Sequence, residues 1–195
     1  MRLHTLTFLL LTGVHCVQGE DTFPKAFTHG KVQGNATLFF YNIDKKEEEN
    51  AYATALGGFL KYTTDDSKPL SASVRFYQSS PVGPNKNLED TALFNNDKEG
   101  SSLTAVAESF AAYRHEAFLF KAGNMMLSTP MMNDDTTRIV PWSYQGFALI
   151  SEAFTDTSIQ LNYIAQIREH TSADYTRQSA SGEFEEGISM LALNL

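Results

Sequence analysis

The sequence predicts an all-β fold, an antiparallel transmembrane β-barrel that crosses a membrane with its strands. Apolar and polar residues alternate along several segments, which is typical of strands whose two faces meet different surroundings. The connections between these segments are alternately long and short, as they are in outer-membrane barrels. The first residues have the pattern of an export signal. Together these three observations favour a barrel in an outer membrane.

Residues 1–19 are predicted to form a signal peptide. Arg2 precedes an apolar run from Leu6 to Leu11, and the small residue Gly19 follows. The run is too short to span a bilayer as a helix, and no later segment approaches the roughly 20 apolar residues that a spanning helix needs. Any membrane crossing must therefore use strands, and residues 20–195 are expected to belong to one barrel domain.

Two segments show the alternation most clearly. In residues 70–77 the members of one face are Leu70, Ala72, Val74 and Phe76, and those of the other are Ser71, Ser73, Arg75 and Tyr77. In residues 158–168 the apolar face is expected to hold Ile159, Leu161, Tyr163, Ala165 and Ile167. Ile164 is the exception to this second pattern. The two faces of such strands must therefore meet different surroundings.

Six weaker strands are expected at residues 31–43, 52–64, 104–113, 116–123, 145–153 and 183–195, which gives eight in all. Their long connections are residues 44–51, 79–102, 124–144 and 169–182, and the short ones are residues 65–69, 114–115 and 154–156. A soluble β-sandwich that binds a ligand or partner is the alternative, because its strands also alternate. The export signal and the regular loop lengths favour the barrel.

Composition excludes several classes of function. The net charge of −8 disfavours nucleic-acid binding, and without residues 1–19 there are 14 basic against 23 acidic residues. Cys16 is the only cysteine, and His29, His115 and His170 have no metal-ligand spacing. No nucleophile, metal or nucleotide motif is present. The chain is therefore not expected to be an enzyme or to need a cofactor.

The segment of residues 121–147 reads KAGNMMLSTPMMNDDTTRIVPWSYQGF. It resembles the OprD family of substrate-selective outer-membrane porins at Gly123, Thr129, Pro130, Asn133, Arg138, Pro141, Tyr144 and Gly146. The resemblance implies a bacterial outer-membrane protein whose barrel has eighteen strands, so residues 20–195 would be its N-terminal portion. One departure is Asn124-Met125, where many members of the family carry Arg-Gln.

The resemblance also implies passive diffusion of small solutes through a pore, with outer-membrane lipid and a homotrimer as expected partners. We expect residues 124–144 to fold inward as a long functional loop, with Arg138, Asp134 and Asp135 at the pore constriction. The basic residues expected to face the lumen are Arg75, Arg168, Lys61 and Lys31. Such a lumen would favour carboxylate-bearing solutes. For each of these residues an ordinary solvated charge or turn is the alternative interpretation.

Overall fold

The computed structural model describes residues 29–45, 49–96, 100–129, 131–154, 156–179 and 182–194. The predicted signal peptide, residues 1–19, lies outside these ranges. The strands of the main sheet are β1 (Lys31–Ile43), β2 (Ala51–Thr63), β3 (Leu70–Pro81), β4 (Leu103–His115), β5 (Phe118–Met125), β6 (Ser143–Phe154), β7 (Thr157–Arg168) and β10 (Ile188–Asn194). A short hairpin, β8 (Gln178–Ser179) and β9 (Gly182–Glu183), and a 3-10 helix, η1 (Leu88–Thr91), lie in the connections.

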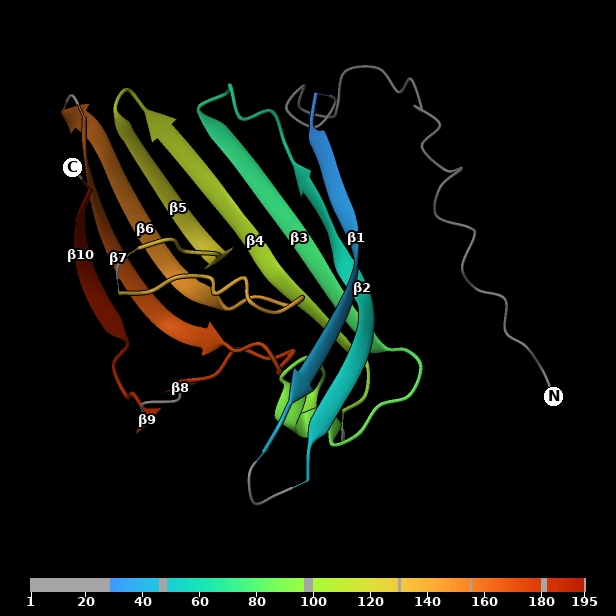
Figure 1. The fold of residues 1–195 in the computed structure, drawn as a ribbon. Helices are drawn as coiled ribbons and strands as arrows, with labels where there is room; N and C mark the ends of the chain where they lie inside the picture. The colour runs from blue at the N-terminus through green and yellow to red at the C-terminus, as the bar shows by residue number, and fades with distance from the viewer. Residues whose placement is uncertain are drawn as a thin grey trace.

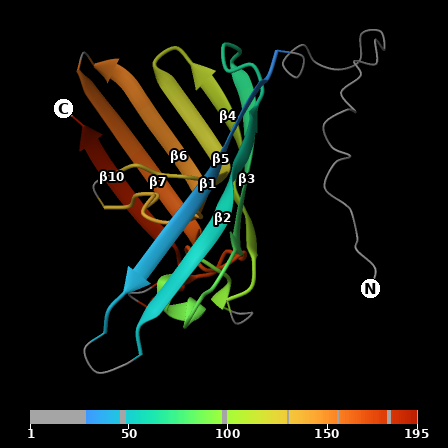
Figure 2. The same ribbon diagram turned by 45° about the vertical axis from the view of Figure 1, so that its right-hand side comes forward.

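The eight strands form one antiparallel sheet in the order β1-β2-β3-β4-β5-β6-β7-β10, so each strand pairs with its neighbour in sequence. The sheet curves into an open wall with β1 and β10 at its edges (Figures 1 and 2). The long connections gather at one end of the strands and the short turns at the other (Figure 1). No helix in the described ranges is long and apolar enough to cross a membrane.

The eight predicted strands are confirmed, although most of their predicted ends lie one or more residues from the observed ends, and two of these differences have a clear local cause. The turn after β4 is not at residues 114–115, because His115 pairs with Phe118 and the chain reverses at Glu116 and Ala117. Glu116 takes a positive φ of 49°, as a tight hairpin requires. The last strand begins at Ile188 rather than at residue 183, because Gly187 turns the chain just before it with a φ of 82°.

The two faces of the sheet differ in chemistry. Large apolar side chains project from the convex face: Leu38, Leu60 and Leu191 are 70%, 58% and 58% exposed. An apolar surface that follows every strand suits hydrocarbon rather than water. The concave face carries Lys61, Arg75 and other polar groups.

A β-bulge in the β6–β7 pair changes which residues of β7 face inward. In the β6–β7 pair the register shifts at Gln145 and Gly146, and Ala165 has no partner in the register. As a result Ile164 and Ile167 both point inward and pack in one apolar cluster with Tyr144. The expectation that Ile167 shares the outward face of Leu161 is therefore wrong, because the extra residue shifts the alternation by one.

Residues 126–142, which we call the constriction loop, connect β5 to β6 and run across the concave side of the sheet (Figure 1). Ile139 and Val140 of this loop pack against Ala53 and Ala55 of β2. At Gly57, further along the same inward row, a side chain would come within 2.8 Å of Ile139 Cγ2. Small residues on β2 therefore let the loop approach the wall closely.

Candidate functional site

Three charged side chains lie side by side on the concave face, on three neighbouring strands. Lys61 of β2 is opposite Arg75 of β3, and Arg75 is opposite Glu108 of β4. Lys61 Nζ lies 3.0 Å and Arg75 Nε 2.8 Å from the same Glu108 Oε2 atom. Two basic groups thus share one carboxylate, which leaves one net positive charge on this part of the wall.

Further contacts fix the guanidinium of Arg75. Its Nη1 lies 3.2 Å from the hydroxyl of Tyr77 and 3.4 Å from Sδ of Met126 in the constriction loop. Its Cζ lies 4.9 Å from the centre of the Phe59 ring. Lys121 of β5 adds a second positive charge, with Nζ 5.1 Å from the centre of the Phe110 ring. These groups make the concave wall attractive to anions.

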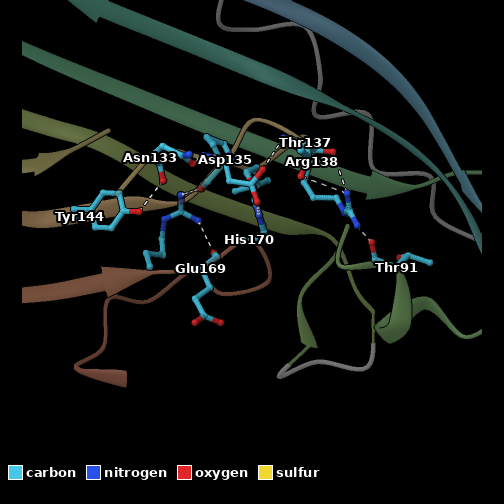
Figure 3. A network of polar contacts seen from close by, with 11 residues as sticks. Thr91, Asn133, Asp135, Thr137, Arg138, Tyr144, Glu169 and His170 are labelled. Atoms are coloured by element: carbon cyan, nitrogen blue, oxygen red, sulfur yellow. Dashed lines mark hydrogen bonds and ion pairs between the residues drawn. The ribbon is translucent and has the colours of Figure 1, made fainter. Parts of the chain in front are cut away.

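Arg138 lies on the constriction loop, and its guanidinium extends toward Thr91 (Figure 3). Its Nε donates to the carbonyl oxygen of Thr91 in η1 at 3.1 Å, and its Cζ lies 4.2 Å from the centre of the Tyr41 ring of β1. Its Nη1 donates to the carbonyl oxygen of Thr137. Within the described ranges no carboxylate pairs with Arg138, so its charge is not neutralised by an ion pair.

The two adjacent acids of the loop differ in their surroundings. Asp134 is half-buried, and its carbonyl oxygen accepts a hydrogen bond from the Trp142 backbone at 2.8 Å. The Asp135 carboxylate accepts hydrogen bonds from the Thr137 backbone at 3.1 Å and from His170 Nε2 at 3.1 Å. These bonds, that of Thr137 first and that of His170 second, lower the pKa of Asp135 to about 2.

Arg168 is fully buried rather than facing open lumen. Its guanidinium donates to the carbonyl oxygens of Pro141, Glu169 and Ser172 and to the hydroxyl of Ser143, at 2.6 to 3.2 Å. The sequence placed it among lumen-facing basic residues, whereas in the structure it ties the end of the constriction loop to β7. Lys31 lies at the other end of the sheet, where it is exposed and pairs with Asp66 at 2.9 Å.

Tyrosine hydroxyls complete the attachment of the constriction loop. Tyr144 donates to the carbonyl oxygen of Asn133 at 2.7 Å (Figure 3). Tyr175 lies 2.9 Å from the Ser143 hydroxyl and donates to the carbonyl oxygen of Val106 at 3.0 Å. Burial raises the pKa of Tyr175, which therefore stays protonated and able to donate. The loop is thereby joined to β4, β6 and the segment after β7.

The sequence did not identify Glu108, Lys121 or His170 as members of this site. A period of two marks Lys121 as inward once Phe118 and Phe120 are assigned outward. Glu108 gives no such signal, because the bulge at Ala107 alters its facing. His170 lies 35 residues from Asp135, and no local pattern connects them. In the described part of the chain, no group of three His, Cys, Asp or Glu side chains could hold a metal ion.

A family of outer-membrane porins matches the sequence of this chain. The model described as "outer membrane porin, OprD family" matches residues 83–192, which is more than half of the chain. No curated protein sequence matches the chain. The family model describes a class of channels and not of enzymes.

Solved structures share the fold at low sequence identity. Pseudomonas aeruginosa OpdK with vanillate superposes with a TM-score of 0.70 and 18% identity, over 86% of this chain and 45% of that chain. Acinetobacter baumannii OccAB3 gives 0.71 and 14%, over 86% and 46%, and OccAB4 gives 0.71 and 16%, over 88% and 48%. The chain thus spans less than half the length of each of these proteins.

Proposed function

This chain belongs to the OprD family of outer-membrane porins, and from that premise we propose that it lines a pore for passive diffusion of small carboxylate-bearing solutes. Its eight strands are part of a β-barrel of the bacterial outer membrane. Family membership removes the alternative of a soluble β-sandwich. In this proposal the concave face borders the aqueous lumen, and the constriction loop narrows it.

The observation that carries the proposal is the excess of positive charge on the concave side. Arg138 has no carboxylate partner within the described ranges, and Lys61 and Arg75 share the single carboxylate of Glu108. Side chains fixed in a narrow aqueous passage select ions by their charge, since the low-dielectric wall concentrates the field. The passage therefore favours anions. Asp134 and Asp135 of the same loop present negative charge beside these basic groups.

The chemistry of a carboxylate fits these groups. A guanidinium presents donors in a fork that matches the two oxygens of a carboxylate, and it also stacks on aromatic rings. Arg138 already lies against Tyr41, and Arg75 against Phe59. The structure of OpdK with vanillate supports the same class of solute, because vanillate is an aromatic carboxylate.

Three further expectations remain part of the proposal. Residues 1–19 act as the export signal, and residues 20–195 form the N-terminal portion of the barrel domain. Arg138, Asp134 and Asp135 lie at the constriction, with Lys61, Arg75 and Lys31 exposed to the lumen or its rim. Barrels of this protein associate as homotrimers in outer-membrane lipid.

Planar-bilayer recording tests the proposed function. With a potassium chloride gradient across the bilayer, we expect a reversal potential of the sign that indicates anion preference. Added benzoate is expected to reduce the chloride current, whereas benzamide, of similar shape but neutral, is expected to leave it unchanged. Any of three results would overturn the proposal. The channels could select cations, benzoate and benzamide could have equal effects, or the inserted protein could give no conductance.

A further inference from the structure

The imidazole of His170 lies between two hydrogen-bond acceptors of the constriction loop. Nδ1 is 2.7 Å from the carbonyl oxygen of Val140, and Nε2 is 3.1 Å from Oδ2 of Asp135 (Figure 3). The ring also meets Trp142 edge-on, with centroids 5.8 Å apart. His170 therefore contacts the loop at three positions, although it belongs to the segment after β7.

Only a doubly protonated ring satisfies both polar contacts. A neutral imidazole has one N–H donor, and its second nitrogen is an acceptor. A backbone carbonyl and an ionised carboxylate accept hydrogen bonds and cannot donate them. If His170 were neutral, one nitrogen lone pair would face either the Val140 carbonyl or the Asp135 carboxylate, and that contact would become repulsive.

Asp135 is ionised wherever histidine changes its charge. Its pKa is lowered to about 2 by the bonds from Thr137 and His170, so the carboxylate persists through mildly acidic and neutral pH. Histidine side chains ordinarily change charge between about pH 5 and 8. The Asp135 carboxylate therefore keeps its charge throughout that range.

The neighbouring charged groups have other contacts. On the loop, Arg138 bonds to Thr91 and Thr137, and Asp134 is the remaining acid. Beside His170, Arg168 bonds to backbone carbonyls, and the carboxylate of Glu169 points away from the ring in Figure 3. The His170 side chain is 13% exposed and the Asp135 side chain is 42% exposed, so water reaches the contact from the carboxylate side.

We propose that His170 is a positioning residue that holds the constriction loop against the wall when both nitrogens of its imidazole are protonated. Protonation of the imidazole adds a donor toward an acceptor. The attachment of the loop is therefore strongest at low pH and weakens as pH rises. Regulation of a pore by this contact rests on the proposed function. The contact between the loop and His170 does not.

A cysteine reporter tests the positioning role without requiring conduction. Thr136 is exposed on the loop, so Thr136→Cys in a Cys16→Ser background provides one thiol there. The rate of maleimide labelling is compared between His170→Gln and the native histidine at the same pH, so that the ionisation of the thiol cancels. His115→Gln, at an exposed histidine before the turn between β4 and β5, is the matched control.

We expect His170→Gln to label roughly two- to fivefold faster at pH 5.5, as the loss of a modest ion pair would give, and at an equal rate at pH 8.5. Asp135→Asn removes the other partner of the contact and should show the same labelling rates as His170→Gln at the two pH values. If His170→Gln fails to assemble, Asp135→Asn tests the positioning role in its place. Equal labelling at both pH values, or an increase independent of pH, would overturn the positioning role of protonated His170.

Channel recording separates this inference from the proposed function. The native pore is expected to show roughly two- to fivefold more frequent closures or current fluctuations at pH 8.5 than at pH 5.5, and His170→Gln should lose that difference. Native channels whose fluctuations do not change with pH would overturn regulation by His170. Absence of any conductance would instead contradict the pore, while the labelling ratios would still decide the positioning role.

Discussion

Arg75 Nε lies 2.8 Å from Glu108 Oε2 across the β3–β4 pair. This contact depends on the bulge at Ala107, because the inward residues before it on β4 are Leu103 and Ala105 and strict alternation would turn Glu108 outward. One extra residue thus transfers a carboxylate from the convex apolar face to the concave charged face. The local charge of the wall is set by this irregularity.

Replacement of Glu108 should affect both stability and selectivity. Glu108→Gln removes the carboxylate shared by Lys61 and Arg75, so two unneutralised cations remain in the wall. We expect a larger anion preference in reversal-potential measurements and lower resistance to heat, by less than the roughly 3–5 kcal/mol typical of a broken buried pair, because water reaches the lumen. Asp66→Asn, at the exposed pair with Lys31, is the control and should cost about 0–1 kcal/mol. Unchanged selectivity would remove this cluster from the pore mechanism.

The charge of Arg138 should set part of the ion preference. Arg138→Glu is expected to weaken or reverse anion preference, because it places negative charge where an unpaired guanidinium lies. Arg138→Lys keeps the charge and should retain the sign of the reversal potential, although it loses the donor fork. If inserted Arg138→Glu channels show native selectivity, Arg138 has no part in selecting ions.

The two faces of β3 should respond differently to a new charge. Val74→Arg places a cation on the convex face and should reduce the stability of the assembled barrel by roughly 2–4 kcal/mol near the membrane midplane. Ser71→Arg, on the inward face of the same strand, should be tolerated because the side chain meets water. Folded and unfolded fractions can be compared by the mobility of unheated samples in gels. Equal impairment by both substitutions would show that the assigned facing is wrong.

Arg168 should stabilise the constriction loop rather than attract solute. Arg168→Lys keeps the charge but cannot make the four contacts of the guanidinium, so buried carbonyl groups lose their donors at about 1–3 kcal/mol each. We expect faster proteolysis of residues 126–142 with little change in the sign of ion selectivity. Arg177→Lys, at a residue with one contact to Glu185, is the control and should change stability by less than about 0.5 kcal/mol. Native resistance of Arg168→Lys to protease would contradict the anchoring role.

Much of the wall could be predicted from local patterns. The first strand was predicted with its observed bounds, Lys31–Ile43, although its alternation is weaker than that of residues 70–77. The hairpin between β4 and β5 was misplaced by two residues, since Glu116 adopts a positive φ without being a glycine. The loop residues Arg138 and Asp135 were identified by position in the chain, but their partners Thr91 and His170 were not.

The sequence by itself determined the class of fold, the eight strands of the main sheet and most of the apolar outer face, because a strand repeats every two residues and each repeat can be read locally. Tertiary structure alone decided which charges meet. The bulges at Ala107 and Ala165 shift the facing of Glu108 and Ile167 without any change in composition. The contacts of Asp135 with His170 and of Arg138 with Thr91 join residues 35 and 47 positions apart, and such contacts form only when the sheet curves and the loop lies across it.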